Sequence, residues 1–187
     1  MSVSQCCEKR RCLYITTQNT TFLRGIEATN EDGVAQWLSI FPGHYTGRTT
    51  HIHIVAYQNG TTFENGTHVA ETVSHVGQVF FDQDLITQIE ATEPYTSNTQ
   101  ALTTNERDGI MRGQASNMDP VLQYVYLGDS LTDGLVMWGA VGIDTQAAYT
   151  IRHAVTLTED GGVVNPDAPQ GPPGGPGGPP PPPQTST

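Results

Sequence analysis

The chain has 187 residues, 36% of them hydrophobic, and carries a formal net charge of −11. This length suits one domain with a compact core. An acidic surface repels phosphate backbones and anionic lipids, so we expect no nucleic-acid partner and no membrane partner. No apolar run approaches the length of a transmembrane helix, and the start MSVSQCCEKRRCLY has no apolar core of a signal peptide.

In chain order, we expect residues 1–13 to be an atypical N-terminal end, residues 14–158 the folded domain, and residues 159–187 a disordered tail rich in Pro and Gly. Of the 13 prolines, 10 follow Asp160, where there is little apolar surface to bury. The cysteines, Cys6, Cys7 and Cys12, match no standard zinc spacing, so we interpret them as part of an unstructured end.

Segments with period-two alternation of apolar and polar residues dominate the middle of the chain, which predicts strands. They are residues 34–40, 50–55, 76–81, 121–127 and 149–157, with turn signals between them. Residues 84–90 can form a turn or two of helix, whereas residues 99–113 are polar and typical of a loop. The pattern predicts an all-β protein, an antiparallel β-sandwich with long loops.

Three Asn-x-Thr sequons begin at Asn19, Asn59 and Asn65. Together they are typical of a glycosylated, extracellular protein, although the absent signal peptide indicates the opposite.

His51 and His53 form a His-x-His pair within the expected strand 50–55. Residues two apart on a strand face the same side, with Cα atoms about 6.6 Å apart. Both imidazoles can therefore reach one metal ion. A hydrogen-bonded or solvent-facing pair is the alternative.

Tyr45 and Arg48 precede this pair. Tyr45 follows a Pro-Gly turn that swings its phenol toward the strand, and a phenol becomes a ligand only when a hard, highly charged cation displaces its proton. Iron(III) suits a phenolate with imidazoles. Arg48 lies three residues before His51, so strict alternation places it on the opposite face. It either enters through the turn or belongs to the surface.

Two other metal sites use paired histidines. The cupin arrangement has a glutamate a few residues after the pair, but residues 54–58, Ile-Val-Ala-Tyr-Gln, hold no carboxylate. A two-histidine hydrolytic site likewise has no carboxylate near His51 and His53.

The segment FPGHYTGRTTHIH, residues 41–53, resembles the iron-site segment of the intradiol ring-cleavage dioxygenases, the relatives of catechol 1,2-dioxygenase and protocatechuate 3,4-dioxygenase. It is most similar to their fungal extracellular branch. The flanking segments TFLRG (21–25), HVGQVFFD (75–82) and GDSL (128–131) agree in order, so the resemblance covers residues 19–145.

The resemblance implies non-haem iron(III) held by two tyrosinates and two histidines. It places ligands at Tyr45, His51 and His53, and it makes Arg48 and Gln78 residues that steady charge on the substrate. Without it, Gln78 reads as a solvent-facing strand residue. The implied substrates are a small aromatic diol and O2, and the implied product is a muconate. The sequence does not indicate an oligomeric state.

The resemblance also requires a first tyrosinate upstream. Only Tyr14 precedes Tyr45, at a shorter interval than in fungal relatives, so Tyr14 is the candidate ligand and an ordinary core or loop tyrosine is the alternative. We expect that the family's front part is missing, which would impair iron binding. A non-catalytic secreted sandwich module that binds a phenolic or cell-surface partner is the competing hypothesis.

Overall fold

The computed structural model describes residues 2–6, 23–64, 68–151, 155–158 and 161–166. Tyr14, Cys7, Cys12 and the sequons at Asn19 and Asn65 therefore lie outside the described residues. The chain divides into two compact units, of which the first contains strands β1 to β6 and both α-helices, and the second contains the β7–β8 hairpin. Within the described ranges, no helix has the length and apolarity needed to cross a bilayer.

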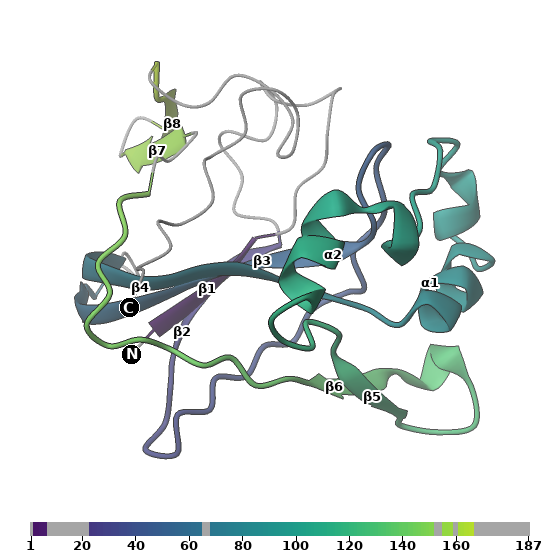
Figure 1. The fold of residues 1–187 in the computed structure, drawn as a ribbon, viewed down its shortest axis with the longest axis horizontal. Coiled ribbons are helices and arrows are strands. Elements are labelled where there is room, and N and C mark those ends of the chain that lie inside the picture. Colours follow the sequence, from purple (N-terminus) through teal and green to yellow (C-terminus); the bar gives the residue numbers. More distant parts are fainter. Residues whose placement is uncertain (1, 7–22, 65–67, 152–154, 159–160, 167–187) are drawn as a thin grey trace. The chain divides into compact units, whose positions relative to one another are not determined.

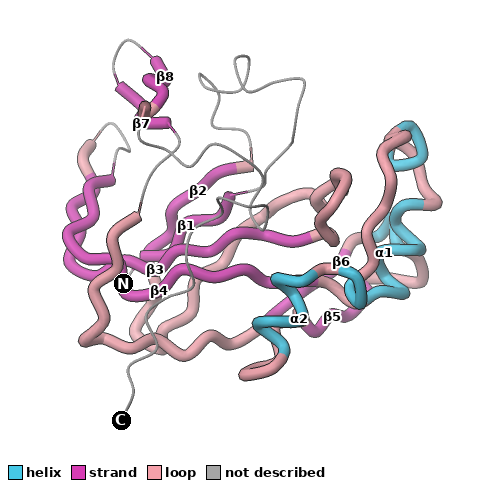
Figure 2. The backbone as a smooth tube through the Cα atoms, turned by 45° about the horizontal axis from the view of Figure 1, so that its top comes forward, coloured by secondary structure: helices cyan, strands magenta, loops and turns pink. Residues whose placement is uncertain are grey.

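The first unit is organised around a four-stranded antiparallel sheet with the strand order β2-β1-β3-β4 (Figures 1 and 2). The strands are β1 (Ser2–Cys6), β2 (Arg24–Ala28), β3 (His51–Thr62) and β4 (His68–Phe80). The two long strands, β3 and β4, are rich in Val, Ile, Thr and Tyr, the residue types that fit a pleated surface. A register shift after Ala56 interrupts their pairing once.

The register of β3 and β4 fixes what lies beside the two histidines. His51 is paired with Phe80, and His53 with Gln78. Directly opposite residues of an antiparallel pair project to the same face of the sheet. His51, His53 and Gln78 therefore share one face, as the sequence pattern predicts for the two histidines.

Helix α1 (Gln83–Glu90) begins directly after β4. The carboxylate of Asp82 caps it by accepting hydrogen bonds from backbone N–H groups two and three residues further on. Leu85, Ile86 and Ile89 form its buried stripe, and they join Phe80 and Phe81 in the core.

The other elements are short. They are the 3₁₀ turns η1 (Tyr95–Ser97), η2 (Asn105–Arg107) and η3 (Leu131–Asp133), helix α2 (Gly109–Ala115), and the hairpins β5 (Gln123–Tyr126) with β6 (Leu135–Trp138) and β7 (Val155–Thr158) with β8 (Gly161–Val164). Backbone hydrogen bonds from Phe80 to Pro120 and from Leu122 to Phe80, both 2.9 Å, attach the segment before β5 to the end of β4.

The all-β class and the antiparallel pairing are confirmed. The segments expected at 50–55 and 76–81 overlap β3 and β4, which extend well beyond them, the segment at 121–127 contains β5, and the helix expected at 84–90 corresponds to α1. The sandwich arrangement remains a prediction.

Two predicted segments are wrong in type. Residues 34–40 pair with no strand in the described part of the chain, and Leu38 and Ile40 are exposed, because alternation alone supplies no partner for backbone hydrogen bonds. Residues 99–113 were expected to form a loop, but they contain η2 and most of α2. Helix α2 is capped locally by Asp108, whereas the contacts of Asp108 with Arg48 and Thr49 come from residues distant in sequence.

The ends also differ from expectation. Ser2–Cys6 forms strand β1 between β2 and β3 rather than an unstructured end. At the other end, the described part of the expected last strand 149–157 contains a bridge from Tyr149 to Val73 and strand β7, while residues 152–154 lie outside the described residues. Strand β8 lies within the predicted disordered tail, because a hairpin with β7 satisfies its backbone groups. Residues 167–187 lie outside the described residues.

Replacing Leu85 by Ala tests where the core lies. Leu85 is 0% exposed, so we expect a loss of about 2–5 kcal/mol in the free energy of unfolding, from lost burial and the cavity left behind. Urea denaturation measures this change. Leu38→Ala is the matched control, because Leu38 is 104% exposed and its truncation should change stability by less than about 0.5 kcal/mol. Equal losses in the two variants would contradict this assignment of the core.

Candidate metal centre

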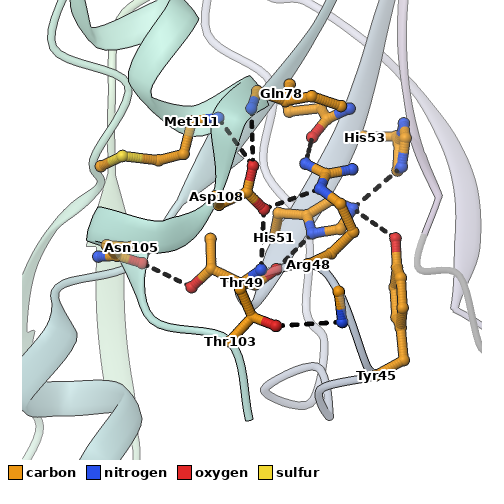
Figure 3. Close-up of polar contacts among 12 residues, drawn as sticks. Tyr45, Arg48, Thr49, His51, His53, Gln78, Thr103, Asn105, Asp108 and Met111 are labelled. Atoms are coloured by element: carbon orange, nitrogen blue, oxygen red, sulfur yellow. Dashed lines mark hydrogen bonds and ion pairs between the residues drawn. The ribbon is translucent and has the colours of Figure 1, made fainter. Parts of the chain in front are cut away.

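Three side chains converge at the start of β3 (Figure 3). The hydroxyl oxygen of Tyr45 lies 3.3 Å from Nε2 of His51, and Nε2 of His51 lies 3.2 Å from Nε2 of His53. Tyr45 is 4% exposed and His51 is 5% exposed. We call Tyr45, His51 and His53 the donor triad, because it directs one phenol oxygen and two imidazole nitrogens toward one another.

The orientation of the His51 ring is set by its own strand. Nδ1 of His51 lies 2.6 Å from the carbonyl oxygen of Thr49. A carbonyl oxygen can only accept, so Nδ1 carries a proton, and in the neutral ring the lone pair is then on Nε2. His51 therefore presents an unprotonated nitrogen to the other two members of the donor triad, which is the form that a metal ion requires.

A tight turn brings Tyr45 into this position. Gly47 has a φ of +92°, a conformation that glycine adopts without strain, and Tyr45 and Arg48 form a bridge across the turn. The Gly47 N–H donates to Oγ1 of Thr103 at 3.1 Å. The turn breaks the strict alternation of the strand, so Arg48 reaches the side of His51 instead of the opposite face. This answers the question that spacing alone left open.

The residue before Tyr45 is also held on several sides. Nδ1 of His44 lies 2.8 Å from Oε1 of Glu90 at the end of α1, and Nε2 lies 2.9 Å from the backbone oxygen of Gln100. The side chain of Asn98 donates to the His44 carbonyl at 2.9 Å. The backbone that carries the Tyr45 phenol is therefore fixed against α1 and the loop that follows it.

Arg48 is buried and paired. It is 3% exposed; its Nε donates to Oδ2 of Asp108 at 2.7 Å, and its Nη2 donates to Oε1 of Gln78 at 2.5 Å. The predicted residues Arg48 and Gln78 are thus in direct contact, and Gln78 is the cross-strand neighbour of His53. Gln78 is half-buried, not solvent-facing as its place in a strand alone suggested.

Asp108 is the residue of this network that sequence analysis missed. Its Oδ1 caps α2 by accepting from the backbone N–H groups of Ile110 and Met111, and its Oδ2 accepts from Arg48 and from the backbone N–H of Thr49 at 2.8 Å. An Asp immediately before the apolar pair Ile110-Met111 is a helix-start signal, and it could have been recognised within the polar stretch 99–113.

The surroundings of Asp108 act on its pKa in opposite directions. Burial raises the pKa, while hydrogen bonds from Met111, Arg48 and Thr49 and the charge of Arg48 lower it, and the net shift is downward from 3.8. Asp108 is therefore ionised beside the guanidinium of Arg48.

Three of the four predicted ligands meet in the donor triad, and the fourth candidate, Tyr14, lies outside the described residues. Among the described residues, no three His, Cys, Asp or Glu side chains cluster as a metal site would require. The described candidate site depends instead on a phenol together with two imidazoles.

The Asp108→Asn substitution should make the free energy of unfolding less dependent on pH. At neutral pH we expect a loss of about 1.5–3 kcal/mol, the range for a hydrogen bond to a charged group. The folded carboxyl binds its proton at lower pH than the unfolded one, so this stabilisation is complete above the ordinary pKa of 3.8 and declines as pH falls through the lower folded value. Urea unfolding from pH 7 to pH 3 should show the gap between wild type and variant narrowing. A constant gap would exclude ionised Asp108 as its source.

No protein-family model matches the sequence, and no curated protein matches it. Among solved structures, the chain is similar to an intradiol ring-cleavage dioxygenase from Tetranychus urticae, with a TM-score of 0.62 and 26% identity over 79% of this chain and 73% of that one. It is also similar to the crystal structure of a dioxygenase, with a TM-score of 0.61 and 26% identity over 79% of this chain and 72% of that one. These similarities confirm the resemblance found in the sequence: the chain is a structural relative of the intradiol ring-cleavage dioxygenases.

Proposed function

We propose that the protein is a non-haem iron(III) dioxygenase that cleaves a catechol-type ring between its two hydroxylated carbons. The observation that carries the proposal is the donor triad, Tyr45, His51 and His53, in a chain whose structural neighbours are ring-cleavage dioxygenases. Those neighbours support a dioxygenase that acts on an aromatic substrate with O2.

The spacing of the donor triad fits a metal ion. Imidazole nitrogens bind transition metals at about 2.0–2.1 Å, so two ligands at right angles around one ion lie about 3 Å apart. The separations of 3.2 Å and 3.3 Å within the triad agree with this value. A phenol oxygen with two nitrogens, and no thiol among the described site residues, suits a hard trivalent ion better than zinc or copper.

When bound, iron(III) would act as a Lewis acid and template that prepares the catecholate ring for O2. The chain's own residues then have distinct tasks. Thr49 holds the proton on Nδ1 of His51 and keeps Nε2 as a donor to the metal. As a phenolate, Tyr45 would take a proton at its phenolate oxygen from a substrate hydroxyl placed at the triad and become a neutral phenol. Both atoms of O2 enter the muconate product, so the reaction needs no external reductant.

Arg48 and Gln78 provide the electrostatic part of the site. Arg48 Nη1 is buried and has no hydrogen-bond partner among the described residues. A buried donor without a partner is rare and marks a place where a ligand oxygen can bind. A cation held next to the donor triad would stabilise negative charge that develops on the substrate.

Three further expectations from the sequence are part of this proposal: the second tyrosinate, the β-sandwich and secretion. Tyr14 stands as the candidate for a second tyrosinate, and the domain at residues 14–158 as a β-sandwich. The sequons support secretion, and one of them, at Asn59, is exposed near the end of β3.

Removing members of the donor triad should abolish metal binding. We expect His51→Ala and His53→Ala to lower iron(III) affinity by more than about 100-fold, since even changes behind the ligands cost 10- to 100-fold. Iron content after dialysis measures this, and a catechol-dependent O2 electrode measures activity. His68→Ala is the matched control, because His68 lies on β4 outside the triad. Tyr45→Phe should weaken the visible tyrosinate–iron(III) charge-transfer band, and Tyr14→Phe tests the candidate fourth ligand.

The wild-type protein decides between the hypotheses. A coloured iron(III) protein that consumes one O2 per catechol supports the proposal. A colourless protein that retains no iron and leaves catechol unchanged would overturn it and favour the non-catalytic module.

A further inference from the structure

Helix α2 contacts the candidate site at two points. At its start, Asp108 accepts from Arg48 and Thr49. Within its last turn, Gln114 donates through Nε2 to the backbone oxygen of Gln78 at 3.0 Å. The short helix is therefore attached both to the turn that leads into β3 and to the strand that carries Gln78.

The two carboxylate oxygens of Asp108 have separate partners. Among the described residues, Oδ1 accepts only from the N–H groups of α2, at 2.9 and 3.0 Å. Oδ2 accepts from Arg48 Nε and from the N–H of Thr49, at 2.7 and 2.8 Å. One oxygen is thus sufficient for the helix cap, and the other is directed entirely at the residues that lead into the donor triad.

Hydrogen bonds to Asp108 and Gln78 occupy one edge of the Arg48 guanidinium. Asp108 takes Nε and Gln78 takes Nη2, which leaves Nη1 buried and without a partner in the described part of the chain. A planar guanidinium held at two of its nitrogens cannot rotate, so the direction of the third is fixed as well.

We propose that Asp108 is a positioning residue for the ring-cleavage reaction: it holds the Arg48 guanidinium so that Nη1 meets an oxygen of the catechol substrate. The inference rests on the proposed function, because it assigns a partner to the substrate-binding arginine. Asp108 itself touches neither the substrate nor the donor triad. It acts through Arg48 and, by the Thr49 N–H, through the residue whose carbonyl orients His51.

Asp108→Asn and Asp108→Ser test this role. Asn and Ser cap helices about as well as Asp, so α2 keeps its cap while Arg48 loses its carboxylate partner. We expect kcat to fall by about 10- to 100-fold, the usual cost of misplacing a catalytic group, with iron content unchanged. Asp82→Asn is the matched control, because Asp82 caps α1 in the same way and has no contact with Arg48 among the described hydrogen bonds. A kcat equal to that of wild type in both Asp108 variants would overturn the inference.

A double-mutant cycle separates positioning from a general structural effect. If Asp108 acts through Arg48, adding Asp108→Asn to an Arg48→Gln variant should lower kcat no further. A full additional loss in the double variant would mean that Asp108 acts by another route, and it would overturn the inference.

One readout needs neither metal nor turnover. In the iron-free protein, the Arg48 Nε–H resonance should be protected from solvent exchange in wild type and Asp82→Asn, and it should lose that protection in Asp108→Asn and Asp108→Ser. If the Arg48 Nε–H is protected equally in the wild type and in both Asp108 variants, the inference is overturned, whatever the activity of the iron-loaded variants. A wild-type protein without iron or activity would instead refute the proposed function, so the two failures are distinguishable.

Discussion

The buried ion pair between Arg48 and Asp108 joins two parts of the chain that are 60 residues apart in sequence. Removing two charges from water is costly, and further hydrogen bonds to the two charged groups offset part of that cost. Here the carboxylate accepts from four N–H groups, including two at the start of α2, and Arg48 also donates to Gln78 on β4. These contacts hold the turn before β3, helix α2 and strand β4 together, and among the described residues they leave Nη1 of Arg48 without a partner. The donor triad is built on the first of these elements.

The same ion pair affects which charges surround the donor triad. The chain carries a net charge of −11, yet the donor triad contains no carboxylate. Asp108, the acid that is buried among the described residues, is directed at Arg48 and is paired there. A carboxylate turned toward the triad would compete with a phenolate for a hard cation, and an unpaired Arg48 would repel that cation. Pairing the two avoids both effects and leaves the phenol and imidazoles as the only donors that the described site presents.

The sequence was informative where the physics is local. The period of the strand placed His51 and His53 on one face, and the Pro-Gly turn placed Tyr45 beside them. The position of Arg48 could not be predicted, because the φ of +92° at Gly47 breaks the alternation on which the argument depended. The pairing of Asp108 with Arg48 and Thr49 could not be predicted because these partners are distant in sequence, whereas its local role as a helix cap was overlooked in a stretch polar enough to resemble a loop. The prediction of a strand at residues 34–40 was wrong for a different reason. Their alternation is typical of a strand, but a strand also needs a neighbouring strand to pair with, and the local pattern does not reveal one.

Gly47 couples the position of the Tyr45 phenol to the position of the Arg48 guanidinium. Tyr45 precedes it by two residues and Arg48 follows it directly, so one turn positions both the phenol proposed as a metal donor and the guanidinium proposed to bind the substrate. Among the described residues, no atom lies within 4 Å of the point where a side chain at Gly47 would begin. Backbone conformation alone therefore opposes replacement. A change that moves the Tyr45 phenol through this turn would also move the Arg48 guanidinium, so the geometry of each proposed role constrains the other.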